Sequence, residues 1–252
     1  VAGFTLNADG SYSFDPSDAA YQHLAEGATQ VLSIPMTVTD SQGATATQNL
    51  IITLTGSNDL PVMSVLTGES VSEGDAAITG HVTATDIDTG DVLTYSTAAT
   101  VDGFSIDPDG TWHFDPSDAA WQHLAEGAQQ VLTIPVTVTD STGATDTQNL
   151  VITITGTNDL PVMSVLTART TTEGDAAING KAFATDIDTG DTLTYSTSAT
   201  VDGFSIGPDG TYRFDPSNAA YQSLNAGAKL ILSIPLTVTD NHGGTATKTL
   251  TI

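Results

Sequence analysis

The segment that decides the fold is residues 130–155, which read QVLTIPVTVTDSTGATDTQNLVITIT. Leucine, isoleucine and valine alternate with threonine and proline before the turn at 141–143, and the alternation resumes after it. A period of two turns one face of a strand towards a core and the other towards water. Because β-branched residues favour such a half-buried surface, the segment predicts a β-hairpin of two long strands.

The same hairpin returns because the chain repeats with a period of 100 residues, and the copies align without a gap. Of residues 1–58, 41 are identical 100 positions later. A period of this length is domain-sized, so we expect complete repeats at 59–158 and 159–252. Residues 1–58 supply only the C-terminal half of a repeat. We interpret them as the tail of a preceding domain, with strand addition from another chain as the alternative.

Turn residues divide the copy at 61–160 into seven predicted strands. Seven short antiparallel strands in about 100 residues indicate an all-β fold, a tandem of immunoglobulin-like Greek-key sandwiches. Pro135 predicts an edge position or a bulge, and a helical turn is expected at Ser117–Leu124 with Ser117 as its N-cap. The short linkers predict neighbouring domains nearly end to end. The predicted strands are Pro61–Thr67, Thr79–Thr85, Val92–Ser96, Gly103–Ile106, Thr111–Phe114, Gln130–Thr139 and Thr145–Thr155.

The charge balance excludes several classes of partner. Thirty Asp and Glu face five Lys and Arg, a net charge of −25, and all five bases lie in the last repeat. Nucleic acid is excluded because phosphate binding needs Lys and Arg, and anionic membranes are disfavoured for the same reason. There is no apolar run of 18 residues, which argues against membrane insertion. Without cysteine, neither disulfides nor zinc–thiolate sites can form.

Acidic residues gather where one repeat meets the next. The stretch Asp86-Ile87-Asp88 points alternate carboxylates the same way along extended backbone, and Gly90 lets the chain turn around a cation. Asn58 and Asp59 add oxygens from the linker, and Asp140 can return from a strand end to the same end of the sandwich. Calcium takes six to eight oxygens of these kinds. The sequence therefore predicts a calcium site, against the alternative of a merely solvated acidic surface.

The last repeat is an internal control because it has diverged. It has lost five acids of the preceding copy but keeps Asp186, Asp188 and Asp240, the counterparts of the loop and strand-end carboxylates. If net acidity were the only requirement, losses should scatter over all acids. The pattern favours ligands at 86, 88 and 140 over solubility alone.

Four stretches together carry a family resemblance: Ala84-Thr85-Asp86-Ile87-Asp88, Phe104-Ser105-Ile106-Asp107-Pro108-Asp109-Gly110, Val136-Thr137-Val138-Thr139-Asp140 and Asn158-Asp159-Leu160-Pro161-Val162. In this order they resemble a cadherin domain, and residues 153–162 resemble the end of a VCBS repeat, found in giant RTX-type and biofilm-associated bacterial adhesins. The resemblance implies a secreted surface protein of cadherin-like sandwiches with Ca²⁺ at the junctions.

The resemblance also implies two ligand sets. The first junction would use Asn58, Asp59, Asp86, Asp88 and Asp140. The second would use Asn158, Asp159, Asp186, Asp188 and Asp240, joined by Glu73, which matches an early cadherin glutamate. Cadherins carry Leu-Asp-Arg-Glu where this chain has Phe114-Asp115-Pro116-Ser117-Asp118, which leaves open whether two or three ions bind at each junction.

These features favour a structural role over an enzyme, since no nucleophile motif, phosphate loop or zinc helix is present. We expect extender repeats on the bacterial cell surface, a monomeric segment of a longer chain that contacts neighbouring repeats and holds a distal binding region away from the cell. The alternative is repeats that themselves bind, by calcium-dependent homophilic pairing or by stacking glycans on the aromatics at 12, 112 and 212. Core packing of those aromatics is expected instead. The histidines show no metal-ligand spacing and are expected at the surface: His23, His81, His113, His123 and His242.

Overall fold

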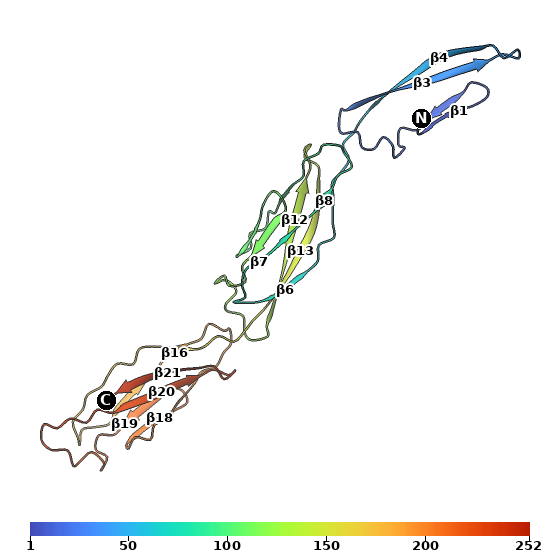
Figure 1. The fold of residues 1–252 in the computed structure, drawn as a ribbon. Coiled ribbons are helices and arrows are strands. Elements are labelled where there is room, and N and C mark those ends of the chain that lie inside the picture. Colours follow the sequence, from blue (N-terminus) through green and yellow to red (C-terminus); the bar gives the residue numbers. More distant parts are fainter. The chain divides into compact units, whose positions relative to one another are not determined.

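The computed structural model describes all of residues 1–252 and contains strands and turns but no helix (Figure 1). The predicted all-β class is therefore confirmed. Contacts divide the chain into two compact units. Unit 1 comprises residues 1–69, 77–115 and 132–152, and unit 2 comprises residues 70–76, 116–131 and 153–252. The middle repeat thus contributes to both units.

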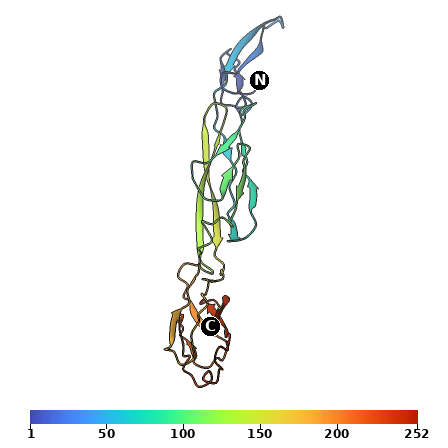
Figure 2. The ribbon, with the colours of Figure 1, turned by 90° about the vertical axis from the view of Figure 1, so that its left-hand side faces the viewer.

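Unit 1 opens with two hairpins. Strands β1 (Phe4–Leu6) and β2 (Tyr12–Phe14) pair antiparallel, and β3 (Thr29–Thr39) pairs with β4 (Thr45–Thr55) along their whole length. The β3–β4 pair is the blue, long two-stranded ribbon of Figures 1 and 2. Its register, from Thr29 opposite Thr55 to Thr39 opposite Thr45, is the hairpin that the period-two pattern predicts.

The sheets of the middle repeat lie partly in unit 1 and partly in unit 2. Strand β5 (Val62–Met63) pairs with β8 (Ala84–Thr85), and β11 (Thr111–Phe114) lies between β10 (Phe104–Ile106) and β7 (Ile78–His81). A four-stranded sheet has the order β6 (Glu69–Ser72), β13 (Thr145–Thr155), β12 (Gln129–Thr139) and β9 (Thr94–Ser96). These two larger sheets are the two layers of an immunoglobulin-like sandwich.

Unit 2 repeats the pattern. The strand β14 (Val162–Met163) pairs with β16 (Ala184–Thr185). One sheet has the order β15 (Ile178–Lys181), β19 (Thr211–Phe214), β18 (Phe204–Ile206). The other has the order β17 (Thr194–Thr197), β20 (Ser233–Thr239), β21 (Thr245–Thr251).

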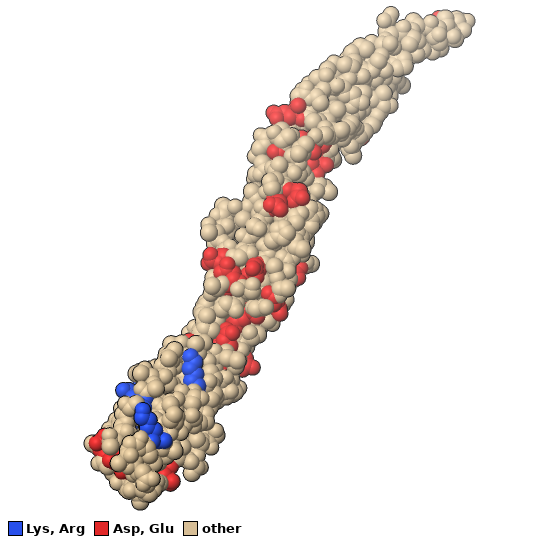
Figure 3. Space-filling model, turned by 60° about the vertical axis from the view of Figure 1, so that its left-hand side comes forward, with Lys and Arg blue, Asp and Glu red and all other residues tan.

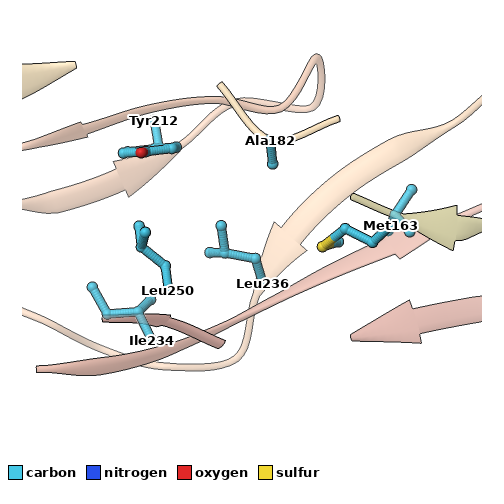
Figure 4. Close-up of a cluster of buried hydrophobic side chains, with 7 residues drawn as sticks. Met163, Ala182, Tyr212, Ile234, Leu236 and Leu250 are labelled. Atoms are coloured by element: carbon cyan, nitrogen blue, oxygen red, sulfur yellow. The ribbon is translucent and has the colours of Figure 1, made fainter. Parts of the chain in front are cut away.

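The core of the last repeat lies between these two sheets. Ile234, Leu236 and Leu250 are completely buried and, with Tyr212 and Ala182, line the space between the strands (Figure 4). Every second residue of β20 is buried, because a pleated strand turns alternate side chains to one face. The alternation predicted for residues 130–155 is likewise confirmed in β12 and β13.

Three local predictions differ from the structure. The predicted strand Thr79–Thr85 divides into β7 and β8, which pair with different partners, β11 and β5. Val82 marks the break; it is 1% exposed, and its amide bonds to the carbonyl of Gly110. The predicted strand Pro61–Thr67 is only β5, and β6 was not predicted.

The predicted helical turn at Ser117–Leu124 is wrong. Two successive turns occupy the segment, because the amide of Trp121 donates to Asp118 and that of Leu124 donates to Trp121. The Asp118 carboxylate accepts the amide of Ala120. Aspartate side chains that bond nearby backbone compete with helix formation.

β12 lies between β13 and β9, but β9 pairs only with residues 137–139, so Pro135 occupies a locally unpaired edge, as predicted. Its counterpart Pro235 shows why proline fits there. Leu232 exchanges both of its backbone hydrogen bonds with Ile252. Backbone groups of successive residues point to opposite sides of a strand, so the nitrogen of Pro235, three residues later, faces β17. That strand ends opposite Leu236, and the hydroxyl of Thr197 donates to the carbonyl of Pro235. No ladder bond is lost.

Candidate metal centre

An acidic loop follows β8 in unit 1 and β16 in unit 2. In unit 1, one oxygen from each of Asp86, Asp88 and Asp91 lies within 4.8 Å of the others. The amide of Asp88 donates to Asp86 Oδ1 at 2.9 Å, and Gly90 completes the turn with a φ of +95°, which favours glycine. The same cluster in unit 2 consists of Asp186, Asp188 and Asp191.

The linker closes over this loop in unit 1. The amide of Asp59 donates to Asp88 Oδ2 at 2.8 Å, and Asn58 Nδ2 donates to Asp140 Oδ2 at 2.9 Å. The structure therefore brings linker, loop and strand end to one place, as the sequence predicts. Whether these residues ligate an ion stays a prediction.

Unit 2 repeats this arrangement and adds Glu73. The amide of Asp159 donates to Asp188 Oδ2 at 2.8 Å, and Asn158 Nδ2 donates to Asp240 Oδ2 at 3.2 Å. Glu73 Oε1 accepts the amide of Thr157 at 2.6 Å. One oxygen from each of Glu73, Asp159 and Asp188 lies within 4.8 Å of the others, so Asp188 belongs to two acidic groups.

Both clusters leave buried oxygens without a hydrogen-bond donor, which is costly unless a cation or water compensates. The orphaned atoms are carboxylate and amide oxygens, the ligands that calcium prefers. The residues therefore fit a calcium ion. In unit 1 the atoms are Asn58 Oδ1, Asp86 Oδ2, Asp88 Oδ1 and Asp91 Oδ2. In unit 2 they are the four counterparts, Asn158 Oδ1, Asp186 Oδ2, Asp188 Oδ1 and Asp191 Oδ2, together with Glu73 Oε2.

The raised pKa values of two carboxyl groups in unit 2 also fit a cation site. Burial raises the pKa of Glu73, which is 3% exposed, and the charges of Asp159 and Asp188 raise it further. Burial also raises the pKa of Asp188, with smaller contributions from Asp159 and Asp186. A cation at the cluster would reverse both effects, because an opposite charge favours the ionised carboxylate.

Asp140 is held differently from the loop acids. Burial alone would raise its pKa, but hydrogen bonds from Asn58, Thr142 and Ala144 outweigh burial and lower the pKa of Asp140 to about 2. Its Oδ1 accepts the amides of residues 142, 143 and 144. The Asp140 carboxylate therefore stays anionic beside the linker and holds the loop between β12 and β13 closed. At Asp240, too, burial alone would raise the pKa, but hydrogen bonds from Asn158, His242 and Gly244 outweigh burial and lower it.

Sequence reasoning missed Asp91 and Asp191 as candidate ligands. The side chain of Asp191 is 2% exposed, and Asp91 Oδ1 accepts the hydroxyl of Ser141. A signal was present, since both loops read Asp-Ile-Asp-Thr-Gly-Asp and end on a third acid directly after the turn glycine.

Each loop also contacts the preceding repeat directly. The amide of Thr89 donates to the carbonyl of His23, and that of Thr189 to the carbonyl of His123, both at 3.0 Å. His242 adds a contact in unit 2, where its Nδ1 lies 2.5 Å from Glu126 Oε2. These contacts join repeats without any ion.

The aromatic residues considered for glycan stacking belong to the core in the complete repeats. Trp112 and Tyr212 are 5% exposed, and each ring lies against a strand glycine, Gly80 or Gly180. Tyr12 is 53% exposed, and no strand of residues 1–58 takes the place of β7 beside it.

A cavity of about 660 Å³ in unit 2 is lined by residues such as Arg169, Glu173 and Tyr221 and shares none with the acidic clusters. No helix in the structure is long and apolar enough to cross a membrane.

The fold and the site define a class: tandem immunoglobulin-like sandwiches with acidic clusters where repeats meet. The sequence model of the bacterial cadherin-like domain matches residues 58–156 and 158–252. The chain belongs to that family, and the predicted cadherin-like resemblance is confirmed. Cadherin-like domains are extracellular, adhesion-related modules of a non-enzymatic family. No curated protein matches the chain.

Solved structures agree on the fold. EC21-23 of human CDH23 aligns with a TM-score of 0.57 at 16% identity, covering 99% of this chain and 81% of that chain. EC22-24 of mouse Cadherin-23 aligns with a TM-score of 0.51 at 18% identity, covering 100% and 81%. PcdhgB3 EC1-4 aligns with a TM-score of 0.52 at 18% identity, covering 99% of this chain but only 62% of that chain.

Proposed function

We propose that the chain is a calcium-stiffened extender segment of a secreted bacterial surface adhesin. One observation carries the proposal. The same four buried oxygens, from the linker Asn and from three acids of the loop, lack a donor at both junctions. The family supports an extracellular, adhesion-related setting, and the proposed adhesin would use these repeats as a spacer beneath a distal binding region.

The proposed layout follows the sequence repeat. Residues 59–158 and 159–252 are complete sandwiches, and residues 1–58 are the C-terminal half of another. The two family matches, at 58–156 and 158–252, support these boundaries.

A bound calcium ion would neutralise the loop carboxylates and link the linker to the following repeat. In unit 2, Glu73 with Asp159 and Asp188, and Asp186 with Asp188 and Asp191, suit two neighbouring ions that share Asp188. Calcium modules of extracellular proteins bind with dissociation constants of about 0.1–1 mM. The junctions would therefore be filled outside a cell.

The test compares the chain with calcium and with chelator by small-angle scattering and limited proteolysis. Calcium is expected to lengthen the particle and to protect the linker at 56–61, and Asp88→Asn is expected to remove that protection. Asp102→Asn is the matched control, since Asp102 is exposed and outside the cluster. An unchanged maximum dimension and unchanged cleavage in calcium would contradict the proposal.

A second candidate function, self-binding of the repeats, is favoured by exposed apolar residues on and beside β14 and β16. Its members are Leu160, Val162, Phe183 and Ile187, which are 52–67% exposed. Because a partner could cover such a face, Phe183→Thr, the residue at position 83, should weaken any calcium-dependent bead aggregation. Glycan stacking is not supported at positions 112 and 212, because the aromatic side chains there are buried.

A further inference from the structure

The loop after the strand-end aspartate differs between the junctions at three positions: Asn241, His242 and Gly244 stand in place of Ser141, Thr142 and Ala144. The two loops share their backbone. The amide of His242 donates to Asp240 Oδ1 at 2.8 Å, and that of Thr142 donates to Asp140 Oδ1 at 2.9 Å. The substitution at position 242 therefore changes the side chain beside the acidic cluster while the loop keeps its shape.

The imidazole of His242 lies between two carboxylates. Its Nδ1 is 2.5 Å from Glu126 Oε2, which belongs to the preceding repeat, and its Nε2 is 3.6 Å from Asp191 Oδ1. The side chain of Asp191 is 2% exposed, and its Oδ2 has no hydrogen-bond partner. Because the imidazole itself is 28% exposed, the group lies at the rim of the cluster, where an ion can enter.

The tautomer of His242 follows from the first contact. We assign the proton of the neutral ring to Nδ1, because Nδ1 and the carboxylate oxygen 2.5 Å away would otherwise both be acceptors. In the neutral ring Nε2 then carries a lone pair, and it faces Asp191 Oδ1, which is also an acceptor. Their separation of 3.6 Å is too long for a hydrogen bond.

That separation suits a metal ion. Zinc–nitrogen and zinc–oxygen bonds of about 2.0–2.2 Å place two ligands of a tetrahedral zinc about 3.4 Å apart. Metal-binding histidines also commonly donate their other nitrogen to a carboxylate, which fixes the ring. Glu126 occupies that position on His242.

We propose that His242 Nε2 and Asp191, at the rim of the cluster with Asp186 and Asp188, bind a divalent transition cation of the zinc class. Calcium takes oxygen ligands, whereas imidazole suits zinc, copper and nickel. The inference rests on the proposed function in so far as the same cluster takes calcium. It gives the second junction a choice of cation that the first lacks.

The test titrates Zn²⁺ into the metal-free full chain by calorimetry, while NMR follows the ring nitrogens of the histidines. Wild type is expected to bind zinc at least tenfold more tightly than His242→Thr, and the Nε2 resonance of His242 should shift. The variant carries the residue that the first junction has naturally, so it should fold. Its unfolding temperature checks this.

Thr142→His is the reciprocal variant. Glu26 and Asp91 already stand at the matching positions of the first junction, where the hydroxyl of Ser141 donates to Asp91 Oδ1. The change is therefore combined with Ser141→Asn, the residue at position 241, and the double variant should bind a second zinc ion per chain. A chain that gains no ion here would overturn the assignment to the Glu–His–Asp group.

Unchanged zinc affinity in His242→Thr, or an unshifted Nε2 resonance, would also overturn the proposal and leave His242 as a hydrogen-bonded bridge. Zinc held only by the other four histidines would give that result. Calcium binding is measured on the same samples. If wild type does not bind calcium, the proposed function is contradicted, while zinc binding that depends on His242 would still support this inference.

Discussion

Glu73→Gln should stabilise the calcium-free protein and weaken its response to calcium. Oxygens of Glu73, Asp159 and Asp188 lie within 4.8 Å of one another. Two unit charges at that distance repel by about 3 kcal/mol at an effective dielectric constant of 20. Solvent and the spread of each charge over two oxygens reduce this value, so we expect a gain of about 1–3 kcal/mol without calcium. Glutamine keeps an oxygen for the amide of Thr157, which Glu73 Oε1 accepts now.

The assay is urea unfolding followed by tryptophan fluorescence. Both tryptophans, Trp112 and Trp121, lie in the repeat that contains Glu73, so the signal reports on that repeat. In chelator the variant should unfold at higher urea than wild type. In calcium, wild type should unfold at higher urea than the variant, because the variant has lost a ligand. Asp75→Asn, an exposed acid in the same turn, is the control.

The pH dependence gives the prediction a second readout. The folded pKa of Glu73 lies above its ordinary value of 4.5, so the native state holds the proton more tightly than the unfolded chain. The stability that protonation contributes is present in full below pH 4.5 and is lost as the pH rises through the folded pKa. Chelated wild type should lose stability over that window, and Glu73→Gln should lose less. Lower stability of the variant in chelator, or an equal calcium response, would refute the reasoning.

Three further changes test the packing. Gly180→Ala places a Cβ 2.3 Å from the ring of Tyr212, so the last repeat should lose several kcal/mol in urea unfolding, whereas Gly68→Ala, which has room, should cost under about 1 kcal/mol. Ile234→Ala empties a completely buried site and should cost about 2–5 kcal/mol in the same assay. Asp146→Ala removes the acceptor of the Met63 amide, 2.8 Å away, and should speed hydrogen exchange of that amide at a cost of about 1 kcal/mol.

Several features could be predicted from the sequence because they depend on local pattern. The hairpin at 130–155 follows from strict alternation, and β13 has the predicted bounds Thr145–Thr155. The candidate ligands of the first junction could be predicted for a similar reason, since Asp86 and Asp88 are two residues apart on extended backbone. The convergence of Asn58 and Asp140 on that loop follows from sandwich topology, in which strand ends and linkers share one end.

Other features could not be predicted, because particular hydrogen bonds and turns, both local and non-local, compete with residue propensity. Asp118 and its neighbours favour a helical turn by composition, yet side-chain bonds to the backbone settle the segment as turns. The division of a strand at Val82 depends on a bond to Gly110, 28 residues away. Asp91 is adjacent to the other loop acids in sequence, but its part in the cluster depends on how Gly90 turns the chain.

The sequence by itself determined the all-β class, the 100-residue repeat and the acidic character of the junctions, because these follow from periodicity and composition. Only the tertiary structure decided which oxygens are buried without a donor, that Asp140 fastens a loop, and that His242 faces Asp191. The physical reason is that burial and partner choice depend on residues as many as 84 positions apart, such as Glu73 and Thr157. Their meeting is fixed by the packing of sheets and not by any local pattern.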